Sequence, residues 1–320
     1  MKTVSSIKSE IKAKGAASIA ELPTLGHHAQ AVIQEQYRHL VKQDKKVLAD
    51  KSAEPLHQMR VGSRRLETAL CVFGGAIELP KAANLKHLSG LRRVLGKLRD
   101  LDVQIESLQE NYRPQLNATE QAYLDEAIDG LRRKRRRAFV KVESVLTRSR
   151  YQRLKTVYTH WLEQPKFTAL AELPLLTLLP DLLTPLLSSL LMHPGWLVPA
   201  DAAHANATCL HDLRKLCKHV RYQGEFFTAF YDEAFQGWIE EVRSLQDNLG
   251  QVQDGQVLLE LLSHRLSHEG HDGQQLDLQR AIDRQQQAAL ADWEPLRQKY
   301  LNLEFRRHLH QMILSPVVKG

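Results

Sequence analysis

The amino-acid sequence contains one motif twice, and the two copies are separated by a constant offset of 154 residues. HQMRVGSRRLETALCVF at 57–73 aligns with HDLRKLCKHVRYQGEFF at 211–227. The same offset aligns LGKLRDLDV at 95–103 with LGQVQDGQV at 249–257. Two separate motifs that keep one register indicate a duplication, so we expect the chain to fold as two copies of one unit. We further expect the copies to pack about a pseudo-twofold axis.

The duplicated unit is predicted to be helical. Apolar residues recur at helical spacing and strand-like alternation is nearly absent. This periodicity predicts helices over 31–48, 85–108, 121–147, 236–262 and 278–303, with proline and glycine between them. The sequence therefore predicts an all-α protein of about eight to twelve helices.

A length of 320 residues fits two domains, or one domain built from two halves. We expect a flexible basic tail over 1–19, a first helical half over 20–165, a second helical half over 166–310 and a C-terminal tail over 311–320. The first tail lacks an apolar core of secretory length, so we do not interpret it as a signal peptide. Three cysteines without a CxxC pair favour a reducing compartment.

Residues 173–192 (LPLLTLLPDLLTPLLSSLLM) are long and apolar enough to suggest a membrane span. The segment also contains Pro174, Pro180, Asp181 and Pro185, and no basic residue flanks its end directly. We therefore expect a short buried helix after a proline-rich connector, in a protein that is soluble and has no membrane partner.

The positive charge belongs to the first half of the chain. The net charge is +7, but residues 1–160 contain 30 basic and 17 acidic side chains, whereas residues 161–320 contain 14 and 20. The field that attracts anions is therefore expected to originate mainly in the first half.

Each copy of the motif is two-faced when it is placed on a helix of about 100° per residue. His57, Arg60 and Arg64 share one arc, and leucines occupy the opposite one. The second copy repeats this division. Glu67 is the only carboxylate that we place at the margin of these arcs, and Arg221 replaces it in the second copy. A cationic face on a single helix can simply be solvated. A face that recurs in both copies and has so few carboxylates favours an anion site, because a bound anion relieves the repulsion between the like charges.

The motifs H-x-x-R-V-x-x-R-R-L from His57 and H-x-x-R-K-x-x-K-x-x-R-Y from His211 resemble the paired signatures of the CHAD family, the conserved histidine α-helical domain. LGKLRDLDV, LQDNLGQVQD and WEPLRQKY also fit this family, and the resemblance covers roughly residues 20–310. It implies two pseudo-twofold-related helical bundles with a central basic channel or cavity. It also implies non-catalytic binding of inorganic polyphosphate and association with polyphosphate granules. A β-rich segment of the CYTH type is absent, so we expect the stand-alone form.

The resemblance assigns two sets of polyphosphate-binding residues. The first set is His57, Arg60, Arg64 and Arg65, and the second is His211, Arg214, Lys218 and Arg221. The second copy has His219 where the first has Arg65, and Gln253 where it has Arg99. We therefore expect the first half to contribute more affinity. Core or capping roles are the alternative for the two motif histidines.

Two further basic clusters are candidates for phosphate contact. Six consecutive basic residues follow Leu131, and a looser cluster lies upstream of them. From these clusters we expect contacts by Arg132, Arg133, Arg136, Arg137, Arg93 and Lys97. Nuclear localisation and RNA contact are the alternatives for the run of six.

Nucleic acid is the rival anion, but only 6% of the residues are aromatic and the arcs hold only Tyr222 for base stacking.

No P-loop, GxSxG, HExxH or acidic two-metal cluster indicates an enzyme. His264, His268 and His271 have metal-compatible spacing, but we expect a polar surface turn there. We predict a cytoplasmic, non-catalytic protein without metal or cofactor, whose partners are polyphosphate and granule-associated proteins. The alternatives are a general polyanion or nucleic-acid binder, or an accessory to a polyphosphate-processing enzyme.

Overall fold

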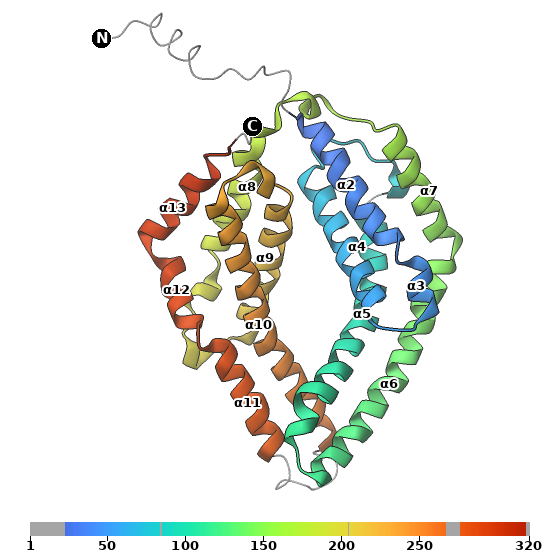
Figure 1. The fold of residues 1–320 in the computed structure, drawn as a ribbon, viewed down its shortest axis with the longest axis vertical. Helices are drawn as coiled ribbons and strands as arrows, with labels where there is room; N and C mark the ends of the chain where they lie inside the picture. Colours follow the sequence, from blue (N-terminus) through green and yellow to red (C-terminus); the bar gives the residue numbers. More distant parts are fainter. Residues whose placement is uncertain (1–22, 84, 204, 267–275, 318–320) are drawn as a thin grey trace, which may run out of the picture.

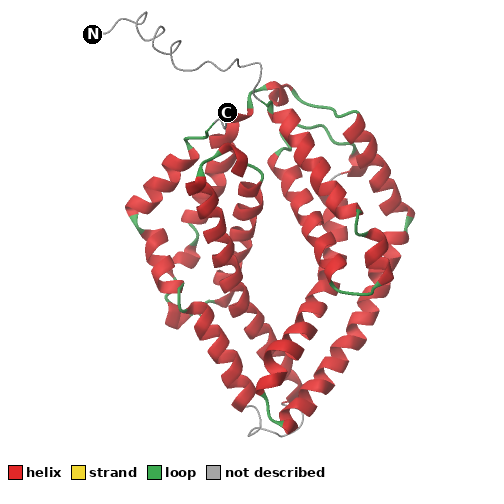
Figure 2. Cartoon of the chain, viewed as in Figure 1, coloured by secondary structure: helices red, strands yellow, loops and turns green. Residues whose placement is uncertain are grey.

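The computed structural model describes residues 23–83, 85–203, 205–266 and 276–317. These residues form twelve α-helices with short 3-10 and π-helical turns, and their extended pairing is limited to two isolated bridges (Figure 2). The prediction of an all-α protein is confirmed. The predicted tail over 1–19 lies outside the described residues, as do His268 and His271 and the side chain of His264.

The first half of the molecule consists of the helices before residue 165. They are α2 (Leu25–Val41), α3 (Asp44–Ala49), α4 (Glu54–Val72), α5 (Leu85–Ser107), α6 (Ala118–Thr147) and α7 (Ser149–Glu163). Pro55 lies in the first turn of α4, where a missing N–H costs no helical hydrogen bond. Asn117 and Glu120 form a capping box that starts α6.

The second half consists of the later helices. They are α8 (Leu175–Leu191), α9 (Ala207–Glu225), α10 (Glu233–Leu266), α11 (Leu276–Leu290), α12 (Trp293–Leu301) and α13 (Leu303–Ile313). The two motif copies thus occupy α4 and α9, both of 19 residues. Figure 1 shows the halves side by side, meeting near the start of α2 and again at the opposite tip.

Two of the predicted helices are each divided in the structure. The segment 31–48 changes direction between α2 and α3, where the Asp44 carboxylate accepts hydrogen bonds from Tyr151 Oη at 2.6 Å and Lys155 Nζ at 2.8 Å. The segment 278–303 breaks between α11 and α12. Apolar periodicity alone did not reveal either break.

Two apolar clusters join the halves. The larger one contains buried residues from both halves, and in it the ends of α4 and α9 meet at Phe73 and Phe227, with ring centroids 5.9 Å apart. His28 of α2 lies against both rings and makes a 3.0 Å hydrogen bond with the Phe226 carbonyl. The smaller cluster packs the α5–α6 turn against Ala281 and Ile282 of α11. The facing surfaces of α4 and α9 are thereby held in a defined relative position.

The apolar segment near residue 180 forms α8, with both internal prolines inside the helix. Leu175–Leu197 is the one segment among the described residues that is long and apolar enough to cross a membrane, with a mean hydropathy of 1.7. Leu175, Leu179, Leu183 and Leu187, spaced four residues apart, are buried in the main core. These leucines form one buried face of α8, and about a third of the apolar segment is buried.

The predicted boundary at residue 165 falls in a segment that bonds back to the first half. Glu78 N donates to the Lys166 carbonyl at 2.9 Å, and Leu25 N donates to the Leu173 carbonyl at 3.0 Å. At the other end, α13 continues to Ile313, three residues beyond the predicted boundary at 310. Both ends of the second half are therefore tied into the folded body.

Candidate functional site

Basic side chains of α4 and α9 converge between the two halves. We call this group the basic seam, and it comprises Arg60, Arg64 and Arg65 of α4 with Arg214, Lys218 and Arg221 of α9. Arg65 Nη2 lies 2.7 Å from Glu225 Oε2 of α9, so the two helices are within side-chain reach. The structure thus brings together the cations of both sequence motifs.

Lys218 is buried in the seam among the other cations, and its pKa is shifted there. Burial and the neighbouring guanidinium groups lower the pKa of Lys218 to about 7. These neighbours include Arg214 on the same helix and Arg60 and Arg64 on the other half. An amine that loses part of its charge near neutral pH marks a site short of counter-charge.

Three seam cations have no carboxylate partner among the described residues. Arg64, Arg214 and Lys218 take part in none of the ion pairs there, whereas Arg60 Nη2 lies 3.7 Å from Asp100 Oδ1. Burial, Arg60 and Arg92 lower the pKa of Arg64. The Nε atoms of the seam arginines Arg65, Arg214 and Arg221 are shielded from solvent and have no acceptor within the described part of the molecule. Buried donors without acceptors are what a bound anion would satisfy.

The glycines of the second motif explain why that motif recurs with the first. A Cβ at Gly96 of α5 would lie 3.6 Å from Arg60 Nε, and a Cβ at Gly250 of α10 would lie 3.0 Å from Arg214 Nε and Nη2. In each half the first motif arginine therefore lies beside a glycine of the next helix, but only at Gly250 would a Cβ crowd it. Gly250 provides the closer approach.

The two motif histidines are half-buried, and the pKa of each is lowered by its surroundings. Burial, and then the charge of Arg99, lowers the pKa of His57. Burial, and then the charges of Lys215 and Arg214, lowers the pKa of His211. His211 Nδ1 is also shielded and has no hydrogen-bond partner among the residues that the structure describes. Both rings are therefore held toward the neutral form in the free protein.

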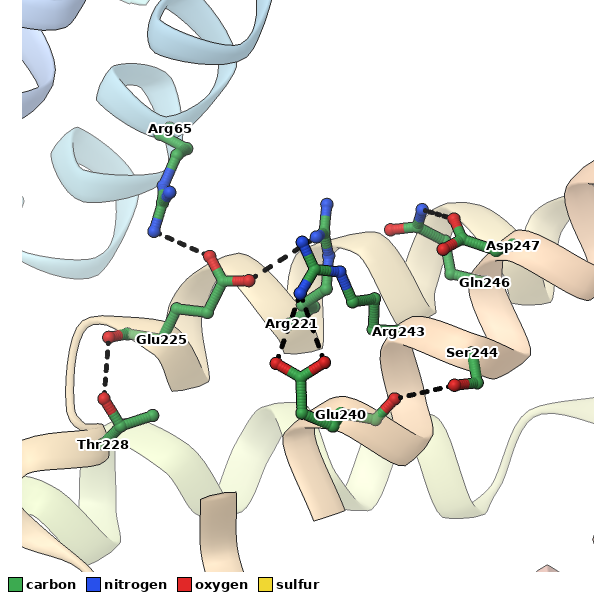
Figure 3. Close-up of polar contacts among 9 residues, drawn as sticks. All are labelled: Arg65, Arg221, Glu225, Thr228, Glu240, Arg243, Ser244, Gln246 and Asp247. Carbon is green, nitrogen blue, oxygen red and sulfur yellow. Dashed lines mark hydrogen bonds and ion pairs between the residues drawn. The ribbon is translucent and has the colours of Figure 1, made fainter. Parts of the chain in front are cut away.

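Glu225 is a carboxylate in the seam that our sequence interpretation missed. It lies 2.7 Å from Arg65 Nη2 and 3.5 Å from Arg221 Nη1, and so links the two halves (Figure 3). The guanidinium carbon of Arg221 lies 4.6 Å from the centre of the Tyr222 ring, and that of Arg65 lies 5.9 Å from it. The prediction that Glu67 is the only carboxylate of the arcs was therefore wrong. Extending the helical wheel by one turn places Glu225 at about 320° from His211, within the cationic arc.

A cavity of 540 Å³ opens beside this ion pair and includes Arg65, Glu225, Gln236 and Glu240 in its lining. Glu240 accepts two hydrogen bonds from Arg243 Nη1, at 3.2 and 3.3 Å (Figure 3). Carboxylates therefore border the seam at this end, and they neutralise the arginines nearest to them.

The looser cluster on α5 lies at the edge of the seam. Arg92 Nε lies 2.6 Å from Glu67 Oε2, so Arg92 is neutralised locally. Arg93 and Lys97 are exposed and make no ion pair within the described part of the chain. Burial, and then the charges of Arg64 and Arg92, lower the pKa of His219, which we interpreted as a weakening substitution. The seam therefore includes a histidine that alignment of the two copies had discounted.

The run of six basic residues lies on α6, outside the seam. Arg135, in the middle of the run, donates to Asp50 at 2.6 and 2.7 Å and to Asp102 at 2.7 Å. The four residues that we predicted as phosphate contacts are all exposed: Arg132, Arg133, Arg136 and Arg137. α6 follows the outer edge of the first half, on the far side of α5 from α9 (Figure 1). The structure does not bring these four residues to the motif cations.

Comparison with known proteins agrees with this architecture. The family model of the CHAD domain matches residues 31–263. The crystal structure of the CHAD domain from the plant Ricinus communis superposes with a TM-score of 0.60 at 22% identity, covering 92% of this chain and 94% of that chain. PptA from Streptomyces chartreusis superposes with a TM-score of 0.55 at 17% identity, covering 91% of this chain and 99% of that one. No curated protein matches the sequence.

Proposed function

The chain belongs to the CHAD domain family, and from this we propose that its basic seam binds inorganic polyphosphate without catalysing a reaction. One observation carries the proposal: cations of both halves converge on Lys218, and their field contributes to lowering its pKa to about 7. Such a site favours a ligand with many negative charges over a ligand with one.

Polyphosphate suits the groups that the seam offers. Its backbone consists of phosphates alone, so recognition needs repeated cations and no surface for base stacking. Guanidinium groups bridge two phosphate oxygens with parallel hydrogen bonds, and Lys218 adds a compact charge. The ligand set that we propose comprises His57, Arg60, Arg64, Arg65, His211, Arg214, Lys218 and Arg221, with Arg93 and Lys97 at the edge. A pseudo-twofold arrangement with a central basic channel belongs to this proposal.

The biological setting that we propose is the cytoplasm, on polyphosphate granules and among granule-associated proteins. A general polyanion binder is the competing function, because the positive field by itself attracts RNA and DNA as well. The seam offers a base little to stack on, since Tyr222 is buried beneath two arginines. This favours polyphosphate over single-stranded nucleic acid.

The experiment that tests this function measures binding of polyphosphate, RNA and triphosphate to the purified chain at matched charge and several salt concentrations. We expect affinity to increase with polyphosphate length and to fall with salt, and RNA to compete poorly. Binding that is independent of length, or equal competition by single-stranded DNA, would contradict the assignment.

Replacing Glu225 by Gln is expected to raise polyphosphate affinity about tenfold at pH 8, because it releases Arg65 and Arg221 for phosphate. A charge-assisted hydrogen bond contributes about 1.5 kcal/mol or more, which corresponds to this factor. Fluorescence anisotropy with a labelled chain measures the change. Glu304→Gln is the matched control, since Glu304 pairs with Arg307 on the exposed α13. A loss of affinity in Glu225→Gln would show that the bridge supports the site instead of competing for it.

The two motif glycines provide a matched pair of variants. Gly250→Ala is expected to lower affinity several-fold, because the new Cβ displaces the Arg214 guanidinium, whereas Gly96→Ala leaves only an ordinary contact with Arg60. Each alanine should also add up to about 1 kcal/mol of helix stability. Binding titrations and thermal unfolding of both variants measure these effects separately. Equal affinities in the two variants would contradict the positioning role of Gly250.

A further inference from the structure

The hydrogen bonds of Arg135 fix the rotation of α6 about its own axis. They thereby fix the side of the helix on which its exposed cations lie. Its guanidinium donates to Asp50 at the end of α3 and to Asp102 of α5, and the Asp102 side chain is nearly buried. At about 100° per residue, Arg133 and Arg137 point about 160° and 200° away from Arg135. They therefore face outward, away from the helix that separates α6 from the seam.

The cations on this outward face lack carboxylate neighbours. Arg133, Lys134, Arg136, Arg137 and Lys141 are all exposed, and none takes part in an ion pair within the described residues. We call these five residues the α6 surface. Except for Arg133, none of them has an Asp or Glu three or four residues away on the helix. Asp129, which lies four residues before Arg133, pairs instead with Arg132 at 3.1 Å. Like charges in i,i+4 positions destabilise a helix, and a bound polyanion removes that repulsion.

The chemistry of the α6 surface favours a phosphate chain over other polyanions. The surface presents guanidinium and ammonium groups, with no aromatic residue among its five members for a base to stack on. Val140 is the exposed large hydrophobic residue beside it, so it also lacks the apolar face by which a helix inserts into a bilayer. Repeated cations without stacking or apolar groups match a polymer made only of phosphate.

We propose that the α6 surface is a second polyphosphate-binding site, separate from the seam, so that one molecule holds two polyphosphate segments at once. This inference rests on the proposed function of the seam. The two sites lie on opposite sides of α5 (Figure 1). A short chain occupies one site only, whereas long chains are bridged. Bridging gives a non-catalytic protein a direct means of cross-linking chains within a granule.

The test compares three variants of the full chain. The outer variant carries Arg133→Gln, Arg136→Gln and Arg137→Gln, and the inner variant carries Arg60→Gln and Arg64→Gln. The charge-matched control carries Arg280→Gln, Arg284→Gln and Arg307→Gln, all at exposed positions of the second half. Glutamine is a good helix former, so the outer variant keeps α6 intact; circular dichroism checks this.

Stoichiometry with short chains is measured first. We expect two polyphosphate chains to bind per wild-type or control molecule, and one per molecule of the outer variant. The affinity of the seam for that one chain should stay within threefold of the wild-type value. The second measurement immobilises one long chain and detects capture of another with a different label. Capture is expected with wild type and control, and at background level with the outer variant.

The outcomes separate the two proposals. One chain per wild-type molecule, lost in the inner variant, would overturn the second site and leave the seam intact. No polyphosphate binding by wild type would overturn both. Displacement of the second chain by RNA at equal charge, with the first chain retained, would identify the α6 surface as an RNA site and overturn the inference.

Discussion

Replacing Arg60 and Arg64 by Gln is expected to lower polyphosphate affinity at pH 8 by about a hundredfold or more. Each arginine supplies charge-assisted hydrogen bonds of about 1.5 kcal/mol or more, and 1.4 kcal/mol corresponds to a factor of ten. Replacing Arg214 and Lys218 by Gln is expected to cost less, because Lys218, with a pKa of about 7, is already largely uncharged at pH 8. The net positive charge of the first half acts in the same direction.

Titration of a labelled chain at several salt concentrations measures both double variants. The salt dependence should be shallower for the Arg60 and Arg64 variant, since fewer phosphate charges are neutralised. Arg284 on α11 and Arg307 on α13, both exposed and outside the seam, provide a control with the same charge change. An equal or larger loss from the Arg214 and Lys218 variant would contradict the asymmetry.

Polyphosphate binding is expected to take up protons and to weaken as the pH rises from 7 to 9. In the free protein Lys218 has a pKa of about 7, and a phosphate beside it stabilises the ammonium form and raises that pKa. The complex therefore holds more protons than the free protein above pH 7, and affinity falls by up to about tenfold per pH unit. The lowered pKa values of His57 and His211 extend the same trend below pH 7.

The stability of the free protein is expected to change in the opposite direction. Unfolded Lys218 keeps its proton up to its usual pKa of 10.5, whereas folded Lys218 loses it near 7. The folded state therefore gains stability as the pH rises through this window. Calorimetry in two buffers of different ionisation enthalpy measures proton uptake, and denaturant unfolding measures stability. Lys218→Arg is the control, because its guanidinium stays charged and removes the alkaline part of both trends. Constant wild-type affinity between pH 7 and 9 would contradict this account.

Local pattern was sufficient to predict the fold class and the helices that bear the motifs. The apolar and cationic arcs of residues 57–73 belong to one helix, and those of 211–227 belong to another. A helical wheel drawn for each helix therefore separates its core residues from its candidate site residues. The break between α2 and α3 could not be predicted in this way. There Asp44 meets Tyr151 and Lys155, more than 100 residues later in the chain, and apolar periodicity carries no sign of such contacts.

The sequence by itself determined that two like-charged helical faces exist, because helical geometry places residues three and four apart on one side. It also identified the family through the duplicated motif. Only the tertiary structure decided which cations share a site, because that depends on how helices distant in sequence pack together. Packing brought Arg64 to Lys218, placed Glu225 between Arg65 and Arg221, and turned most of the cations of 132–137 away from the seam through the bonds of Arg135.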